Sequence, residues 1–194
     1  MQGIVHSIGS FFLDIIETVV IALSIFLIVY LFVASPHQVD GQSMEPNFHS
    51  GEYVLSDKVS YRVGQVKRGD VVVFHAPETA RCPKGTGCDF IKRILGLPGE
   101  SIQVYDNKVW VNGQALDEPY IPTTFRTLPR EATQNRTVVS LGPDEYFAVG
   151  DNREHSSDSR EWGPITKGEI VGKAFIRYWP PQAAGVIPHA SYPF

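Results

Sequence analysis

Twenty consecutive residues with one formal charge dominate the first part of the chain. Residues 15–34 read IIETVVIALSIFLIVYLFVA, and Glu17 carries the only formal charge among them. A helix of this length spans about 30 Å, which matches the hydrocarbon core of a bilayer. Glu17 lies in the first turn, where a negative charge suits the helix dipole. The stretch predicts a transmembrane helix, with a short tail at 1–14 before it and a domain at 35–194 after it.

A cleavable signal peptide is the alternative for this segment, because Val33-Ala34-Ser35 resembles a small-residue cleavage site. However, no Lys or Arg precedes Lys58, so the basic segment typical of a signal peptide is missing. We therefore predict a retained, single-pass anchor. The positive-inside rule gives no orientation here, although a domain of about 160 residues can translocate whatever its charge.

Charge and composition exclude one class of function and limit the architecture. The formal net charge is -4 and no block of five or six like charges occurs, whereas phosphate contacts need a clustered basic surface. We therefore expect no nucleic-acid partner. A chain of 194 residues, 43% of them hydrophobic, is long enough for one packed domain besides the membrane segment.

The two cysteines, Cys82 and Cys88, flank the short loop Pro-Lys-Gly-Thr-Gly. Their spacing is not the CxxC of a redox enzyme, and without nearby paired histidines they make a poor zinc site. We predict a disulfide between them, which suits an oxidising compartment. We also expect neither a metal nor a cofactor.

After Ser35-Pro36 the sequence changes to short β-type runs separated by Gly, Pro, Asn and Asp, which predicts a mainly β domain. The two-residue turn Asp106-Asn107 predicts a hairpin. Residues 115–136 are rich in Pro and Thr and lack periodicity, so we expect an ordered loop there. The predicted strands are 53–57, 70–74, 90–95, 101–105, 108–111, 137–140, 145–149 and 170–178.

The first candidate segment for catalysis is Gly41-Gln42-Ser43-Met44-Glu45-Pro46, which begins seven residues after the predicted membrane exit. A serine that has a glycine shortly before it and an apolar methionine after it can act as a nucleophile. Nearby backbone N–H groups can then form an oxyanion hole. By itself the segment is more typical of a turn or N-cap serine.

The second segment is a predicted strand with two adjacent cations, Lys92 and Arg93. Strand alternation places Lys92 on the same face as Phe90 and Ile94, and Arg93 on the opposite face. Burial lowers the pKa of a lysine, whereas arginine stays protonated, so Lys92 is the candidate for a neutral general base. The alternative is an edge-strand lysine whose amine stays in water.

The third segment, 150–160 (GDNREHSSDSR), is densely polar. It fails as a calcium loop, because position six is Ser156 where glycine is needed and position twelve is Trp162 in place of glutamate. A Ser43–His155–Asp158 triad is a second interpretation, which we rank below Lys92 as the base. A solvated loop held by Asp–Arg pairs is the structural alternative.

Four blocks together resemble the bacterial type I signal peptidases, membrane-bound Ser–Lys proteases with a β-rich catalytic core. They match in order and cover nearly the whole predicted domain. Lys92 also separates the chain from the endoplasmic-reticulum type, which has histidine at that place. The blocks are 43–46 (SMEP), 69–74 (GDVVVF), 92–99 (KRILGLPG) and 150–160.

The resemblance implies a role for each matching residue. Ser43 is the nucleophile, Lys92 the general base, and Ser156 orients the lysine amine. Asp158 and Arg160 brace the site, with Asp151 nearby. Backbone groups of Ser43 and Gly41 form the oxyanion hole, because Gly41 stands where some members have a serine. Shallow apolar pockets for small residues at positions -1 and -3 of the substrate are expected from Val39, Met44, Phe48, Val73, Phe90 and Ile91.

The resemblance also implies partners and a location: signal peptides of secretory preproteins, the lipid bilayer and the secretion translocon. We expect a single-pass protein of the bacterial plasma membrane with its catalytic domain on the extracytoplasmic side. Two rival functions are a self-cleaving repressor-type Ser–Lys protease, disfavoured because the chain has no DNA-binding helix pair, and a membrane-tethered β-domain that binds an extracytoplasmic partner without catalysis.

Overall fold

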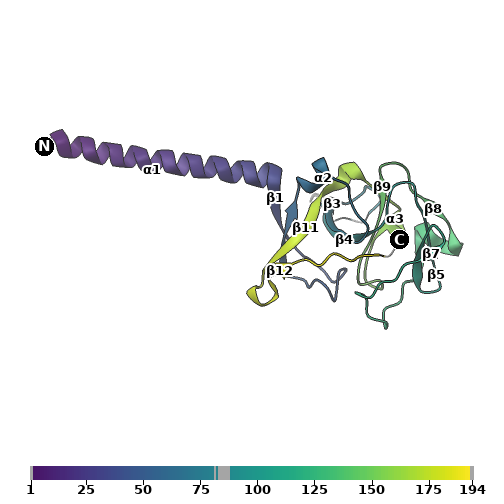
Figure 1. The fold of residues 1–194 in the computed structure, drawn as a ribbon. Helices are drawn as coiled ribbons and strands as arrows, with labels where there is room; N and C mark the ends of the chain where they lie inside the picture. Colours follow the sequence, from purple (N-terminus) through teal and green to yellow (C-terminus); the bar gives the residue numbers. More distant parts are fainter. Residues whose placement is uncertain (1, 81, 83–87, 193–194) are drawn as a thin grey trace.

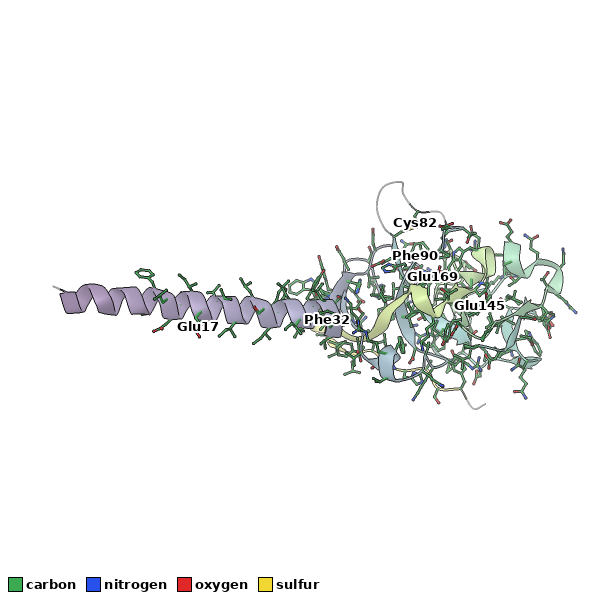
Figure 2. All side chains as sticks on the ribbon, turned by 90° about the horizontal axis from the view of Figure 1, so that it is seen from above. Glu17, Phe32, Cys82, Phe90, Glu145 and Glu169 are labelled. Atoms are coloured by element: carbon green, nitrogen blue, oxygen red, sulfur yellow. A yellow bond between two sulfur atoms is a disulfide. The ribbon has the colours of Figure 1, made fainter. Side chains whose placement is uncertain are left out.

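A long helix projects from a β-rich body (Figure 1) in the computed structural model, which describes residues 2–80, 82 and 88–192. The helix consists of α1 (Gln2–Ile28) and its π-helical continuation η1 (Val29–Val33). Among the described residues, Phe11–Val33 is the one helix long and apolar enough to cross a membrane, and none of it is buried against the body. Figure 2 shows Glu17 on the projecting part and Phe32 at the junction.

The helix begins earlier than the predicted transmembrane segment. It starts at Gln2, so residues 2–14 of the predicted tail are helical. No proline occurs before Pro36, and nothing therefore interrupts the helix earlier. Proline disfavours the helical conformation of the residue before it, and the chain becomes extended as β1 (Ala34–Gln38).

A lysine from the body closes the C-terminal end of the helix. Lys58 Nζ donates to Tyr30 O at 3.2 Å and to Leu31 O at 3.4 Å. These carbonyls lie in the last helical turn, where intrahelical partners are lacking and positive charge suits the helix dipole. The Arg62 guanidinium lies over the Phe32 ring. The membrane helix is thus tied to the body by side-chain contacts as well as by the chain.

Two antiparallel sheets make up the body. The larger has the order β1-β2-β11-β3-β4-β9-β10, with β12 paired to β11, and the smaller has the order β7-β6-β5-β8. Two four-residue helices, α2 (Ser60–Val63) and α3 (Ser159–Trp162), lie between strands. The remaining strands are β2 (Tyr53–Asp57), β3 (Val71–His75), β4 (Asp89–Gly96), β5 (Ser101–Tyr105), β6 (Lys108–Val111), β7 (Gln114–Ala115), β8 (Val139–Ser140), β9 (Glu145–Val149), β10 (Ile165–Thr166), β11 (Ile170–Trp179) and β12 (Gly185–Val186).

The mainly β prediction is confirmed, and each of the eight predicted strands is present within two residues of its expected bounds. Asp106 and Asn107 both have positive φ, as the predicted tight hairpin turn requires. The strands that the sequence did not indicate are β1, which contains a proline, and the two-residue strands β7, β10 and β12. Residues 115–136 are largely irregular and end in the 3-10 helix η2 (Glu131–Arg136).

The connection between β3 and β4 carries the two cysteines. Cys82 and Cys88 are disulfide-bonded in the structure, and Cys88 directly precedes β4. Figure 2 shows Cys82 and Phe90 on the same side of the body. The strand that carries Lys92 therefore begins beside a covalent cross-link.

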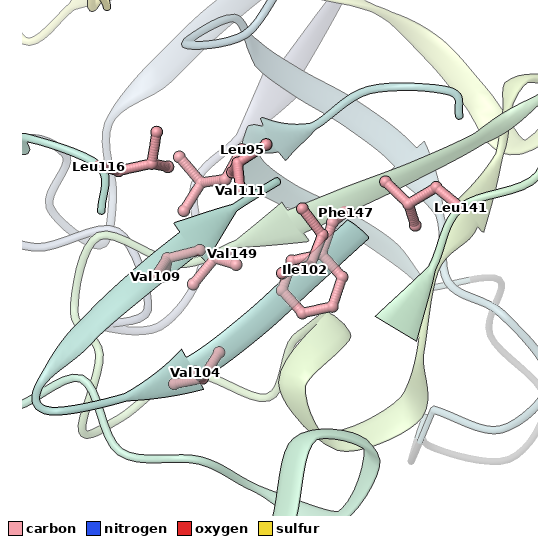
Figure 3. Close-up of a cluster of buried hydrophobic side chains, with 9 residues drawn as sticks. All are labelled: Leu95, Ile102, Val104, Val109, Val111, Leu116, Leu141, Phe147 and Val149. Atoms are coloured by element: carbon pink, nitrogen blue, oxygen red, sulfur yellow. The ribbon is translucent and has the colours of Figure 1, made fainter. Parts of the chain in front are cut away.

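The core where the two sheets meet consists of aliphatic side chains around Phe147 (Figure 3). Leu95 of β4 and Phe147 and Val149 of β9 face strands of the smaller sheet, so this cluster fastens the hairpin sheet to the sheet that carries the site. Its members are Leu95, Ile102, Val104, Val109, Val111, Leu116, Leu141, Phe147 and Val149, all buried.

We expect Phe147→Ala to lower the free energy of unfolding by about 3–5 kcal/mol, because it leaves a cavity between the two sheets. Leu128→Ala, at a side chain that is 55% exposed, should change it by less than about 0.5 kcal/mol. Denaturant unfolding of the detergent-solubilised protein measures both values. Equal effects of the two variants would contradict this assignment of the core.

Candidate active site

Ser43 and Lys92 come together from separate elements. Ser43 lies in the loop between β1 and β2, and Lys92 lies in the middle of β4. Lys92 Nζ is 2.8 Å from Ser43 Oγ and 3.0 Å from Ile91 O. Met44 and Phe48 belong to the same loop and anchor it, because both side chains are buried in an apolar cluster. The packing of these two side chains therefore positions the serine hydroxyl over the strand.

The surroundings of the amine favour its neutral form. Lys92 is only 3% exposed, and its burial lowers its pKa to about 8, a shift opposed by the Asp158 and Asp151 carboxylates and reinforced by Arg160. The Phe90 ring lies 5.1 Å from Nζ. A substantial fraction of the lysine is thus unprotonated at mildly alkaline pH and can accept the proton of the Ser43 hydroxyl.

Arg93 points away from Lys92, as strand alternation requires, but it is buried rather than solvated. Its Nε and Nη2 donate to Asp151 Oδ1 and Oδ2 at 2.9 and 2.7 Å. Asn47 Nδ2 donates to the same Asp151 carboxylate at 2.9 Å. This group joins β4, the Ser43 loop and the polar segment 150–160 on the side of the strand opposite the lysine.

Asp158 and Arg160 form a second buried pair. Arg160 Nε and Nη2 each lie 2.8 Å from an oxygen of the Asp158 carboxylate, which also accepts from Gly150 N at 3.1 Å. Burial raises the pKa of Asp158, but Arg160 and the hydrogen bonds outweigh it and lower that pKa below its ordinary value. The charged carboxylate fixes the backbone beside Ser43, since Asn152 N donates to Ser43 O at 3.0 Å.

A third buried arginine was not assigned a partner from the sequence. Arg153 Nη1 donates to Glu118 Oε2 at 2.8 Å and to Thr127 Oγ1 at 2.9 Å, and Arg153 Nε donates to Gly150 O at 3.0 Å. Glu118 and Thr127 belong to the irregular stretch 115–136. No periodicity marks them, and their only signal is that an isolated buried arginine needs an acidic partner.

Ser156 is close to the dyad without contacting the lysine through a hydrogen bond. Among the described residues its buried hydroxyl has no hydrogen bond of good geometry, although its proximity to Asp158 contributes to the low pKa of that carboxyl. A Cβ added to Gly150 would lie 2.2 Å from Ser156 Oγ and 2.5 Å from Ser43 O. Gly150 is therefore the contact point between the polar segment and the nucleophile loop.

The two backbone donors expected for the oxyanion hole differ in their environments. Gly41 N donates to Ser50 Oγ at 3.3 Å, so it is already engaged. Within the described part of the chain, Ser43 N has no hydrogen-bond acceptor. The Ser43 N–H is thus the backbone group open to a substrate oxygen.

A cavity of about 510 Å³ opens beside the dyad. Of the residues expected to form substrate pockets, Val39, Val73, Phe90 and Ile91 line it, whereas Met44 and Phe48 do not. Both of the latter are packed in the cluster behind Val39, with exposures of 1% and 2%, because they hold the Ser43 loop. The cavity is lined by Pro36, His37, Gln38, Val39, Asp40, Gly41, Gln42, Ser43, Val54, Val73, Asp89, Phe90, Ile91, Lys92, His155 and Ser157.

The structure does not assemble the alternative triad. His155 is exposed at the cavity, and no hydrogen bond joins its side chain to Ser43 or Asp158 among the described residues. Both Asp158 oxygens are occupied by Arg160 and the Gly150 backbone. The carboxylate therefore has no role in orienting His155.

Comparison with known proteins identifies the family of the chain. The model of the family described as signal peptidase, peptidase S26, matches residues 12–179. The chain belongs to the signal peptidase family. It is 36% identical over 177 residues to the probable signal peptidase I-2 of a Synechocystis species, covering 90% of this chain and 77% of that one. It is also 36% identical over 182 residues to signal peptidase IB of Staphylococcus aureus, covering 87% and 90%.

A crystal structure of a signal peptidase I from Enterococcus faecalis is similar in part, with 27% identity and a TM-score of 0.45 over 57% of this chain and 97% of that one. Membership of the signal peptidase family makes the chain a serine endopeptidase, a hydrolase. The family also supports signal-peptide removal as its activity.

We expect Gly150→Ala to reduce peptide cleavage by at least about 100-fold, because the new methyl group would displace Ser156 or the Ser43 backbone and misalign the dyad. Gly168→Ala is the matched control, since its added Cβ meets only ordinary contact. Cleavage rates at equal protein concentration measure both, with circular dichroism to verify folding. A folded, fully active Gly150→Ala enzyme would contradict the geometry.

Proposed function

We propose that the chain removes signal peptides from exported preproteins with Ser43 as nucleophile and Lys92 as general base. The observation that carries the proposal is the 2.8 Å separation of Lys92 Nζ and Ser43 Oγ, with the amine buried. A nucleophile within hydrogen-bond reach of a base with a lowered pKa is the arrangement that nucleophilic catalysis requires.

The reaction proceeds in two halves. Neutral Lys92 takes the Ser43 hydroxyl proton while Oγ bonds to the scissile carbonyl carbon, and the resulting ammonium then protonates the leaving amine as the C–N bond breaks. In the second half, Lys92 takes a proton from water, the hydroxide attacks the acyl-enzyme ester, and the proton returns to Ser43 Oγ. The proposed reaction uses only the dyad, the substrate and water.

The rest of the site stabilises charge and alignment. Ser43 N–H donates to the developing oxyanion. In other enzymes a preorganised donor of this kind stabilises the transition state by about 2.7–4 kcal/mol. We assign the lysine-orienting role to Ser156, whose buried hydroxyl has no well-formed hydrogen bond within the part of the chain that the structure describes. Asp158 and Arg160 brace the segment that carries Ser156, and Asp151 does the same for β4 through Arg93.

The substrate lies in an extended conformation between two strand edges. Among the described strands, β1 pairs only with β2, and residues 89–91 of β4 pair only with β3. Both strands present unpaired backbone groups to the cavity, which is the setting for strand addition. We expect small substrate residues at positions -1 and -3, with the apolar walls at Val39, Val73 and Ile91 beside the residue next to the cut.

In the proposed topology, Phe11–Val33 spans the bacterial plasma membrane once and the β-domain faces the extracytoplasmic side. The exposed apolar side chains of the span support this placement. Lys58 and Arg62, at the end of the helix, then lie at the level of the lipid headgroups. Preproteins reach the cavity from the secretion translocon, so the proposal includes contact with it.

Replacing either member of the dyad tests the chemistry. We expect Ser43→Ala and Lys92→Met each to reduce preprotein cleavage by at least about 1,000-fold, since each removes a group that acts in every turnover. Lys108→Ala, a lysine exposed on β6, is the matched control and should retain activity. Full activity in Ser43→Ala or Lys92→Met would contradict the dyad. So would a pair of results in which His155→Ala loses activity while Lys92→His keeps it.

The pH dependence tests the protonation state. Only the neutral amine accepts the serine proton, and the pKa of Lys92 is about 8. We therefore expect kcat/KM to rise about tenfold per pH unit between pH 5.5 and 7, and to level off above about pH 9. A peptide without ionisable groups near the cut isolates the enzyme's titration. A flat profile from pH 6 to 9 would exclude a titrating lysine base.

A further inference from the structure

The cavity is lined by polar as well as apolar side chains. Val39, Val54, Val73 and Ile91 are apolar, whereas His37 and Asp89 are polar and lie 3.8 Å apart between His37 Nδ1 and Asp89 Oδ2. His37 comes from β1 and Asp89 is the first residue of β4, so each of the two strand edges contributes one polar side chain. The cavity therefore presents polar groups beside the apolar ones that the family resemblance implied.

Strand geometry relates these polar side chains to a substrate position. Asp89 and Ile91 both belong to β4, whereas Val39 directly follows β1 and continues its pairing through Val39 N and Glu52 O. His37 and Val39, like Asp89 and Ile91, are two residues apart in extended chain, so each pair is on one face and about 6.8 Å apart. Residues -1 and -3 of an extended substrate have the same spacing and also share a face. If the side chain at -1 lies between Val39 and Ile91, the side chain at -3 lies between His37 and Asp89.

The hydrogen bonds of His37 fix its tautomer. Ser56, which is fully buried, donates from Oγ to Ser35 O at 3.3 Å. A carbonyl only accepts, so Ser56 Oγ accepts from His37 Nε2, 2.9 Å away. Burial lowers the pKa of His37, and the Asp89 carboxylate only partly opposes this shift. Because its pKa is lowered, the ring is neutral at pH 7. Nδ1 is therefore an unprotonated acceptor.

That acceptor faces another acceptor. His37 Nδ1 lies 3.8 Å from Asp89 Oδ2, too far for a direct hydrogen bond. The other carboxylate oxygen is already paired, because Asp89 Oδ1 lies 2.7 Å from Nδ1 of His75 on β3. The positive charge of Lys58 further lowers the pKa of His37 and so favours the neutral ring. Two acceptors, one on each wall, thus face each other across the cavity, and neither can donate to the other.

We infer that His37 and Asp89 form a polar specificity site that selects a small hydroxyl side chain, serine or threonine, at position -3 of the signal peptide. The hydroxyl donates to one of the two facing acceptors, which cannot pair with each other. Valine has the shape of threonine but no donor, and it would leave both acceptors desolvated and unpaired. This inference rests on the proposed function and adds a substrate preference to it.

Two substrates that differ only by a hydroxyl group in place of a methyl group test the inference. Two fluorogenic peptides share one sequence with alanine at -1 and carry threonine or valine at -3, and mass spectrometry verifies the cut. We expect the wild-type enzyme to cleave the threonine peptide about three- to tenfold more efficiently in kcat/KM, the range of one net hydrogen bond. Equal cleavage, or faster cleavage of the valine peptide, would overturn the inference.

Variants locate the preference. His37→Phe keeps an aromatic ring without acceptors and should abolish or reverse the threonine preference, and Asp89→Asn should reduce it. His49→Ala, at a histidine exposed away from the cavity, is the matched control and should leave the ratio unchanged. A threonine preference that survives in both His37→Phe and Asp89→Asn would also overturn the inference. If His37→Phe is inactive, Asp89→Asn and the wild-type ratio decide.

The design separates this inference from the proposed dyad. Cleavage that persists in Ser43→Ala would refute the dyad, whatever the ratio. Cleavage that depends on Ser43 and Lys92 but has a threonine-to-valine ratio of one would refute the specificity site alone.

Discussion

The arrangement depends on keeping a lysine amine out of water beside a serine hydroxyl. A buried ammonium is costly, and a carboxylate bound directly to it would restore the charge and make it a poor base. Here the carboxylates that act on Lys92 are each committed to an arginine, Asp158 to Arg160 and Asp151 to Arg93. The paired arginines satisfy the buried carboxylates and limit their attraction for the lysine, so Lys92 keeps a pKa of about 8.

The same pairs shape the backbone. Asp158 accepts from Gly150 N, Arg153 donates to Gly150 O, and Asn152 N donates to Ser43 O. The polar segment 150–160 is therefore a rigid support rather than a solvated loop. Removing one partner of such a buried pair leaves an uncompensated charge, with an expected cost of about 3–5 kcal/mol. Charges buried this way specify one position for the segment that faces the nucleophile.

Local patterns in the sequence were sufficient for eight of the strands and for the two faces of β4. Alternation along β4 put Lys92 and Arg93 on opposite faces, as the structure has them, and the turn at Asp106 and Asn107 marked the hairpin. The links that the sequence did not reveal are long-range: Glu118 with Arg153, and Asn47 with Asp151, 104 residues apart. Neither has a periodic or spacing signal, because only the fold brings the partners together. Likewise, Met44 and Phe48 are apolar residues of the kind that line substrate pockets. Only the packing shows that they are buried in the core and anchor the Ser43 loop.

The short strand β1 relates the membrane to the chemistry. It follows the helix directly, forms one wall of the cavity and leads into the loop with Ser43. Its five residues span about 17 Å, and Lys58 fastens the helix end to the strand beside it. In Figure 1, β1 turns away from the axis of α1 instead of continuing along it. In the proposed topology the strand therefore runs along the membrane surface rather than away from it. The cavity that β1 lines then lies close to the lipid headgroups, where the end of a membrane-embedded signal peptide can reach it.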